Sequence, residues 1–569
     1  MNESIFLNLE NSDVKFEGII FTNSVFEKDI ETCGDIIFDN CTFNENVVLD
    51  NIKCREFSFT NCKFENEFII VNSLFIIGSI YECKFHKKIG ISSNNCSSLF
   101  VIRKVEVKEA YINGEYGTFQ IVSSKIEKLV LQNINNERSH KESKIEFLIE
   151  NEINEIRIKT FSTQSDISFK GGVYKEVFFE GVFEDRISFQ KNVTITHLYF
   201  ESSVFKRRID FEDGNFEFIN FYRSNFQGLV LINDFNYDKI INRNLKIHKI
   251  TIHSCIYEMD MSVQLDKIEY IDLSNNNFKQ IFNFNNYAKK LNKDSLVMIS
   301  IGGTNQGNII IENVYLDVTI RDINFGNLIF KDLNILNLYI NEFQNEGNVT
   351  FTNVKSGLYF TIQDSISGKL NFLNFDVNIF KEIVISNCTL TGINFNKYPN
   401  KIFSFSKNPK IGYGLSEKSE NKSNLRSVYN QLKHISRFKG NIEVSNKFQS
   451  KEYKQLLLSK KLDFDSILLF LNLISNNNGG SWIRGVLFTI LVSFSFFILY
   501  LQNIGIVEYN IDSLKDYTIF ISSFPKLELE KYSSENKLWN TKLIIWFARI
   551  FTTYGIYQTI SAFRKYGKG

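Results

Sequence analysis

Proline is nearly absent from this chain. Of its 569 residues only three are proline, and Pro399, Pro409 and Pro525 all lie beyond residue 398. Average usage would place about 20 prolines in a stretch of that length. Proline cannot donate a backbone hydrogen bond and is rare inside β-sheets. Residues 1–400 are therefore not a proline-rich linker, and their composition indicates extensive backbone pairing.

An excess of one charge sign is also missing. The net charge is +1 and 43% of the residues are hydrophobic, which excludes a disordered chain. Residues 1–400 carry a net charge of −11, spread over their whole length. This spread charge is too weak for the strongly acidic surface of a DNA mimic, and we expect no nucleic-acid partner.

A secretion signal is a third absence. The N-terminal residues contain no basic segment followed by an apolar run, so we expect no signal peptide. The eight cysteines are then expected to be reduced thiols of a cytosolic environment rather than a disulfide framework.

A repeat fills residues 1–400. Related hexapeptides begin at Phe21, Phe38, Phe59 and Ile80, at similar intervals along the chain, and another begins at Ile385. A unit of about 20–22 residues cannot bury its own apolar face, so it stacks on its neighbours.

A shorter period lies inside this repeat. Bulky residues recur every five or six positions at Phe200, Phe205, Phe211, Phe216, Phe221 and Phe226. This period fits neither a helix nor a simple strand, so the chain is expected to turn a corner about every five residues. Four such sides make a coil, with asparagine suited to the corners. Some 17–19 coils at about 4.8 Å each predict a rod of about 80–90 Å.

This pattern resembles the bacterial pentapeptide-repeat family. The resemblance is best at 16–85, 167–226, 268–278 and 383–396. It implies an all-β right-handed quadrilateral β-helix over residues 1–400. The pattern loosens elsewhere, where a three-sided β-helix with longer coils is the alternative. Polar residues 132–144 are expected to form a protruding loop.

Residues 401–475 are a basic segment. Between 401 and 461 there are 14 basic and 4 acidic residues. Apolar residues at helical spacing on both sides of Gly440 predict two basic amphipathic helices. They are expected to cap the open end of the β-helix, to contact anionic lipid headgroups, or to do both.

Residues 476–569 predict a transmembrane hairpin. Residues 482–501 contain one charge, Arg484, and are long enough to span a bilayer. Residues 543–562 form a second, less apolar candidate that contains Arg549 and Gln558. The predicted anchors at the membrane surface are Trp482, Arg484, Trp539, Trp546, Arg564 and Lys565.

Charge asymmetry predicts the topology. The loop 502–541 has 4 basic and 6 acidic residues, whereas basic residues flank the two predicted spans on the other side. Both termini and the β-helix are therefore expected in the cytoplasm. Residues 557–566 and the Ser481-Trp482 entry look like the membrane module that ends some bacterial pentapeptide-repeat proteins. That resemblance implies attachment to the bacterial inner membrane.

Arg549 is the most informative polar residue of the predicted spans. A charge inside a span marks a candidate functional site. Arg549 is interpreted either as an anchor that reaches the membrane surface or as a residue that lines a pore or an interface between spans. Thr552, Thr553 and Gln558 accompany it and suit hydrogen bonds between helices.

No catalytic site is predicted. His253 and Cys255 lack the further ligands that a metal site needs, and the glycine-rich segment 302–307 lacks the ending of a phosphate-binding loop. No cofactor, metal or small-molecule substrate is expected, and the chain is not predicted to be an enzyme.

Two functions remain. The first is a membrane-anchored, non-enzymatic scaffold whose β-helix binds a protein partner. The second is an oligomeric membrane effector or channel, of a stress or phage-defence type, gated by the β-helix.

Overall fold

The computed structural model describes most of the chain. It covers residues 13–567 except Cys33, 136–142, 234–244, 265–267, 286–295, Ser356, 404–417, 461–462, 506–510 and 523–537. Two compact units are present. The first consists of residues 1–360, 368–381 and 394–397, and the second of residues 361–367, 382–393 and 398–569.

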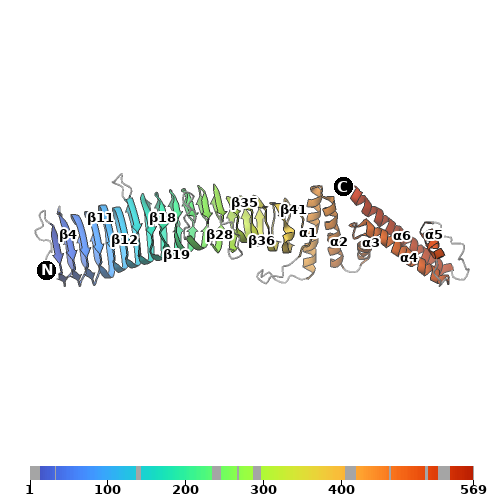
Figure 1. Cartoon of the computed structure of the whole chain (residues 1–569), viewed down its shortest axis with the longest axis horizontal. Coiled ribbons are helices and arrows are strands. Elements are labelled where there is room, and N and C mark those ends of the chain that lie inside the picture. Colours follow the sequence, from blue (N-terminus) through green and yellow to red (C-terminus); the bar gives the residue numbers. More distant parts are fainter. Residues whose placement is uncertain are drawn as a thin grey trace. The chain divides into compact units, whose positions relative to one another are not determined.

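The first unit is a parallel β-solenoid, seen as stacked arrows from β4 to β41 in Figure 1. Its early turns carry four rows of pairing. These join β1 (Val14–Glu17) to β4 (Asp35–Asp39), β2 (Ile20–Phe21) to β5 (Thr42–Phe43), β3 (Val25–Lys28) to β6 (Val47–Asp50), and Glu31 to Lys53 of β7 (Lys53–Thr60). The expected four-sided coil is thus present in this region.

The solenoid is right-handed and has about 16 turns, close to the 17–19 expected. At about 4.8 Å per turn, 16 turns make a rod of about 77 Å. Most paired residues lie 19–23 positions apart, as Phe38 and Phe59 do. Longer turns separate Phe119 from Ile145 and Val230 from Met261. Most of the predicted 132–144 loop lies outside the described residues, and residues 132–135 belong to β13 (Lys125–Asn135).

Stacked aromatic rings fill the interior. The ring centroids of Phe43 and Phe64 are 4.7 Å apart, and those of Phe64 and Phe85 are 4.4 Å apart with nearly parallel planes. All three side chains are buried. This confirms that the bulky residues of successive repeats point inward and lie above one another.

Asparagine and other polar residues form the corners. In the hexapeptide repeats that begin at Phe38 and Phe59, the residue before the small buried side chain has a left-handed backbone: Asn40 precedes Cys41 with φ 53°, and Asn61 precedes Cys62 with φ 52°. Asparagine tolerates this conformation better than most residues. A second left-handed corner in each early turn, at Asn51 and Asn72, was not predicted.

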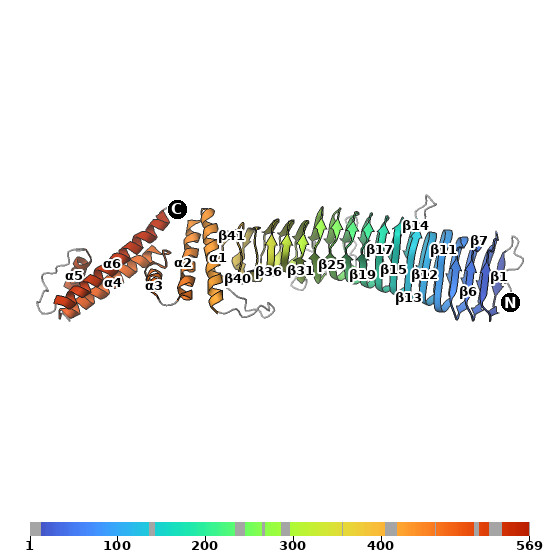
Figure 2. The same ribbon diagram turned by 180° about the vertical axis from the view of Figure 1, so that it is seen from behind.

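The second unit holds the helices. They are α1 (Lys418–Phe438), α2 (Ile442–Ser459), α3 (Phe464–Asn476), α4 (Trp482–Asn503), α5 (Ile511–Ser522) and α6 (Leu538–Gly567). Helices α4 and α6 lie side by side in both Figure 1 and Figure 2. The two predicted basic helices are α1 and α2, separated at Gly440, whose φ is +77°.

Helix α1 contacts residues 388–393 within this unit. The Gln431 side chain accepts a hydrogen bond from the Leu390 backbone N–H at 2.6 Å and donates one to the Cys388 carbonyl at 2.8 Å. Lys439 Nζ donates to the Ile393 carbonyl at 3.3 Å. These bonds satisfy backbone groups of residues 388–393. That the two helices cap the β-helix stays a prediction.

Candidate functional site

Three helices of the second unit have an inverted distribution of side chains. Helices α3, α4 and α6 bury mostly small or polar residues, including Ser466, Asn476, Ser493, Thr552, Gln558 and Ala562. The exceptions, Phe497, Tyr500 and Leu501 near the end of α4, form a buried apolar cluster with Phe520 of α5 and Ala548 of α6. The exposed side chains of the three helices are large and apolar, including Phe464, Ile467, Leu468, Phe470, Ile483, Leu487, Leu491, Phe494, Phe547 and Ile550. A helix of a water-soluble protein buries its apolar stripe instead. The observed distribution is typical of helices packed in lipid.

Close contact between small residues joins α4 to α6. A Cβ atom added at Gly485 would lie 2.6 Å from Thr559 Oγ1, and one added at Gly555 would lie 2.5 Å from Thr489 Oγ1. Only glycine allows this approach, because a larger residue would push the helices apart. Glycine and threonine at such contacts are characteristic of membrane helix pairs.

A buried polar cluster joins α3 to α6. Asn476 Nδ2 donates to Gln558 Oε1 at 2.6 Å, and Gln558 Nε2 donates to Asn472 Oδ1 at 2.7 Å. The Tyr554 hydroxyl donates to the same Asn472 oxygen at 2.7 Å. Gln558 therefore makes the helix–helix hydrogen bonds expected of it, but its partners belong to α3. Asn472, Asn476 and Tyr554 were not predicted.

The register of α4 against α6 places Arg549 deep in the helix pair. At one end Asn503 Nδ2 donates to Thr541 Oγ1 at 2.8 Å, and near the other Gly485 faces Thr559. The two helices are therefore antiparallel, and each residue forward along α4 corresponds to one residue back along α6. In this register Arg549 of α6 lies level with Ser495 of α4. Ser495 is two to three residues from the middle of α4, which is about 4 Å at the helical rise. Arg549 Nε is enclosed and has no hydrogen-bond partner among the described residues.

One face of α6 is partly cationic. Lys542, Arg549, Thr553 and Arg564 follow one another on this face at spacings of 7, 4 and 11 residues. Lys542, Thr553 and Arg564 are exposed, and Arg549 is half-buried. By contrast Thr552 is buried, so the two neighbouring threonines point to different surroundings.

One helix in the described residues, α4, is long and apolar enough to cross a bilayer. Only 17% of its apolar window is buried, whereas the core helix of a water-soluble protein is mostly buried. The second predicted span is not supported by this criterion. Instead of the expected 543–562, α6 is one continuous helix from Leu538 to Gly567, and its charges and amides lower its apolar character.

The predicted anchors lie at several levels of the helix pair. Trp482 and Arg484 are exposed in the first turn of α4, and Trp482 packs edge-on against Phe563 with ring centroids 6.1 Å apart. Trp539 is 77% exposed at the start of α6, while Trp546 is exposed further along it. Arg564 is exposed near the end of α6, and the side chain of Lys565 lies outside the described residues.

Aromatic rings also stack on the outside of the solenoid, which the sequence analysis missed. Phe178 stacks on Tyr199 at 4.6 Å and His197 on Phe218 at 4.8 Å, all half-buried on the outer side of their strands. Arg157 lies over the Phe178 ring at 4.5 Å. The signal was present as a ring at the same position of successive repeats, but it was hidden among the many core phenylalanines.

In the residues that the structure describes, no group of three His, Cys, Asp or Glu side chains can hold a metal ion. Burial raises the pKa of the Cys96 and Cys255 thiols to about 12. Such thiols are protonated at neutral pH and therefore poor nucleophiles.

The chain matches no protein-family model, no curated protein and no solved structure.

Proposed function

We propose that this protein is a membrane-anchored scaffold. Helices α3, α4 and α6 attach it to a bilayer, and the β-solenoid presents a long surface to a protein partner. The observation that supports the proposal most is the inverted distribution of side chains in these helices. Exposing Leu487, Leu491 and their neighbours to water would leave an apolar surface that soluble proteins avoid.

The solenoid surface supports the binding part of the proposal. Partly exposed aromatic rings and arginine are enriched at protein interfaces, and Arg157, Phe178 and Tyr199 form such a group. The proposed role needs no chemistry, since a rigid surface at a fixed place is sufficient for a scaffold.

We place the protein at the bacterial inner membrane, with the solenoid and both termini in the cytoplasm. Helix α4 crosses the bilayer in this arrangement, and α6 returns alongside it. The small-residue contact between α4 and α6 supports a hairpin, and the polar cluster with α3 satisfies Gln558 inside it.

A pair of double variants tests the attachment. In Leu487→Lys/Leu491→Lys two exposed apolar residues of α4 become charged. In the control, Ile20→Lys/Ile76→Lys, two equally exposed apolar residues of the solenoid do. We expect the first variant to leave the carbonate-resistant membrane fraction and the control to stay there. Equal behaviour of the two variants, or a wild-type chain that stays in the soluble fraction, would refute membrane attachment.

The cationic face of α6 favours a second candidate, an oligomeric channel. With α4 across the bilayer, Arg549 lies near the midplane, where a charge is retained mainly for function. Several copies that direct this face inward would line an aqueous path with Arg549 and Thr553. Two measurements separate the candidates: mass photometry of the extracted protein gives its oligomeric state, and a conductance measurement on the reconstituted protein tests for a pore. A monomer without conductance supports the scaffold, and a ring whose conductance is lost in Arg549→Leu supports the channel.

A further inference from the structure

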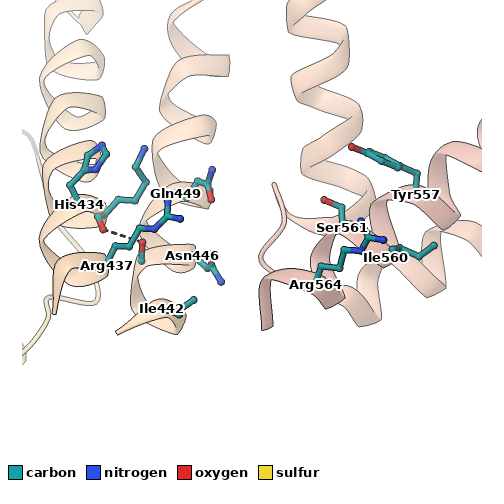
Figure 3. A pocket seen from close by; sticks show the side chains of 11 residues that line it. His434, Arg437, Ile442, Asn446, Gln449, Tyr557, Ile560, Ser561 and Arg564 are labelled. Carbon is teal, nitrogen blue, oxygen red and sulfur yellow. Dashed lines mark hydrogen bonds between the residues drawn. The ribbon is translucent and has the colours of Figure 1, made fainter. Parts of the chain in front are cut away.

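A cavity in the second unit has a lining rich in hydrogen-bond donors. It has a volume of about 840 Å³, within the usual range of ligand sites, and lies between the first two helices and the end of α6. Figure 3 shows Arg437, Asn446 and Gln449 on one wall and Ser561 and Arg564 on the other. Among its described lining residues there is no carboxylate.

The cavity has an excess of positive charge. Lys433 is neutralised by Glu452, with Nζ and Oε2 2.8 Å apart. Arg437 and Arg564 form no ion pair among the described residues. The first turn of α2 contributes Ile442 and Ser445 to the lining, and the start of a helix favours a bound anion.

Asn446 provides an independent observation. The residue is 8% exposed, lines the cavity, and its Nδ2 has no hydrogen-bond partner in the described part of the chain. A buried donor without an acceptor is costly. An anion in the cavity would supply the missing acceptor.

The level of the cavity identifies the source of the anion. By the register of α4 against α6, Arg564 lies just beyond Trp482, the residue at which the apolar helix begins. With α4 across the bilayer, this is the depth of the phospholipid phosphates. We propose that the cavity binds the phosphate of an anionic phospholipid through Arg437, Arg564 and Asn446 Nδ2. This proposal rests on the membrane attachment described above.

Lipid retention by the full chain, extracted in detergent, tests the site. Native mass spectrometry would count phosphatidylglycerol and phosphatidylcholine retained per chain. We expect one phosphatidylglycerol, held about tenfold or more weakly in Arg437→Gln/Arg564→Gln, because each charged hydrogen bond is worth about 1.5–3 kcal/mol, where 1.4 kcal/mol is tenfold. The near-isosteric Asn446→Asp, which replaces the donor with an acceptor, should lose the lipid as well.

The control removes two cations from the same basic helices outside the cavity, in Arg426→Gln/Lys454→Gln. Equal loss in this control, or equal retention of phosphatidylcholine, would overturn the site. Binding of soluble glycerol phosphate is measured separately. If it binds as tightly as the lipid, the proposal that the bound phosphate belongs to a phospholipid is refuted. Melting followed by circular dichroism shows that each variant folds. Carbonate extraction of the same variants distinguishes a chain that is not membrane-bound from one that is membrane-bound without this site.

Discussion

Replacing Arg549 should strongly favour insertion of α6. The register places Arg549 about 4 Å from the level of the middle of α4. On translocon scales arginine at mid-span costs about 2.5–3.5 kcal/mol, whereas leucine gains about 0.5 kcal/mol. Arg549→Leu should therefore favour insertion by about 3–4 kcal/mol. This corresponds to a change of more than about a hundredfold in the ratio of inserted to uninserted α6.

Lys542 provides the matched control. The same register puts it level with Gln502, at the end of α4, about 14 Å from the middle. Lys542→Leu removes one charge from the same face of α6, but at the depth of the membrane surface, so insertion should change by less than about 1 kcal/mol.

Translation into microsomes measures both effects. Glycosylation acceptor sites placed on either side of α6 report which fraction of chains has it inserted. Similar shifts for Arg549→Leu and Lys542→Leu would refute the register. No shift for Arg549→Leu, with α4 inserted normally, would show that α6 does not lie across the bilayer beside α4.

Three further predictions concern the core, the helix pair and the thiols. Phe64→Ala should lower the free energy of unfolding by about 3–5 kcal/mol in urea titration, whereas Ile76→Ala, on an exposed side chain, should change it by less than about 0.5 kcal/mol. An equal loss in both would contradict the inward register. Gly555→Leu, whose Cβ would lie 2.5 Å from Thr489 Oγ1, should separate α4 from α6 and speed protease cleavage in detergent; unchanged cleavage would contradict the contact. Cys255, with its pKa raised to about 12, should react with a maleimide at pH 8 only after unfolding, as mass spectrometry would show; rapid reaction of the folded chain would contradict its burial.

Local spacing was sufficient to predict the solenoid. Phe43, Phe64 and Phe85 are evenly spaced along the chain, and because the interval between them is the length of one coil their rings stack. Asn40 and Asn61 occupy corners because they tolerate a left-handed backbone. The corners at Asn51 and Asn72 were missed because they lie outside the hexapeptides, although the small buried Ser73 follows Asn72.

The helical site was harder to predict because its contacts are long-range. In the sequence alone, Gln558 only interrupts an apolar span, because its partner Asn476 lies 82 residues away along the chain. Asn472 likewise only interrupts a short apolar helix, because its partners are also distant in the sequence. Hydropathy along the chain cannot show that these amides satisfy one another. It also cannot show that α6 begins at Leu538, since the residues before position 543 are mostly polar.

The four-row pairing of the solenoid has a consequence for how its length can change in evolution. Each turn contacts only the turns before and after it, so removal of a segment as long as one coil, such as positions 41–61, joins equivalent corners. The shortened rod keeps every ring above another ring and loses about 4.8 Å. A deletion of half that length would join unlike corners and turn core side chains toward water. Insertions and deletions in related chains should therefore come in whole coils, which would adjust the reach of the rod in discrete steps.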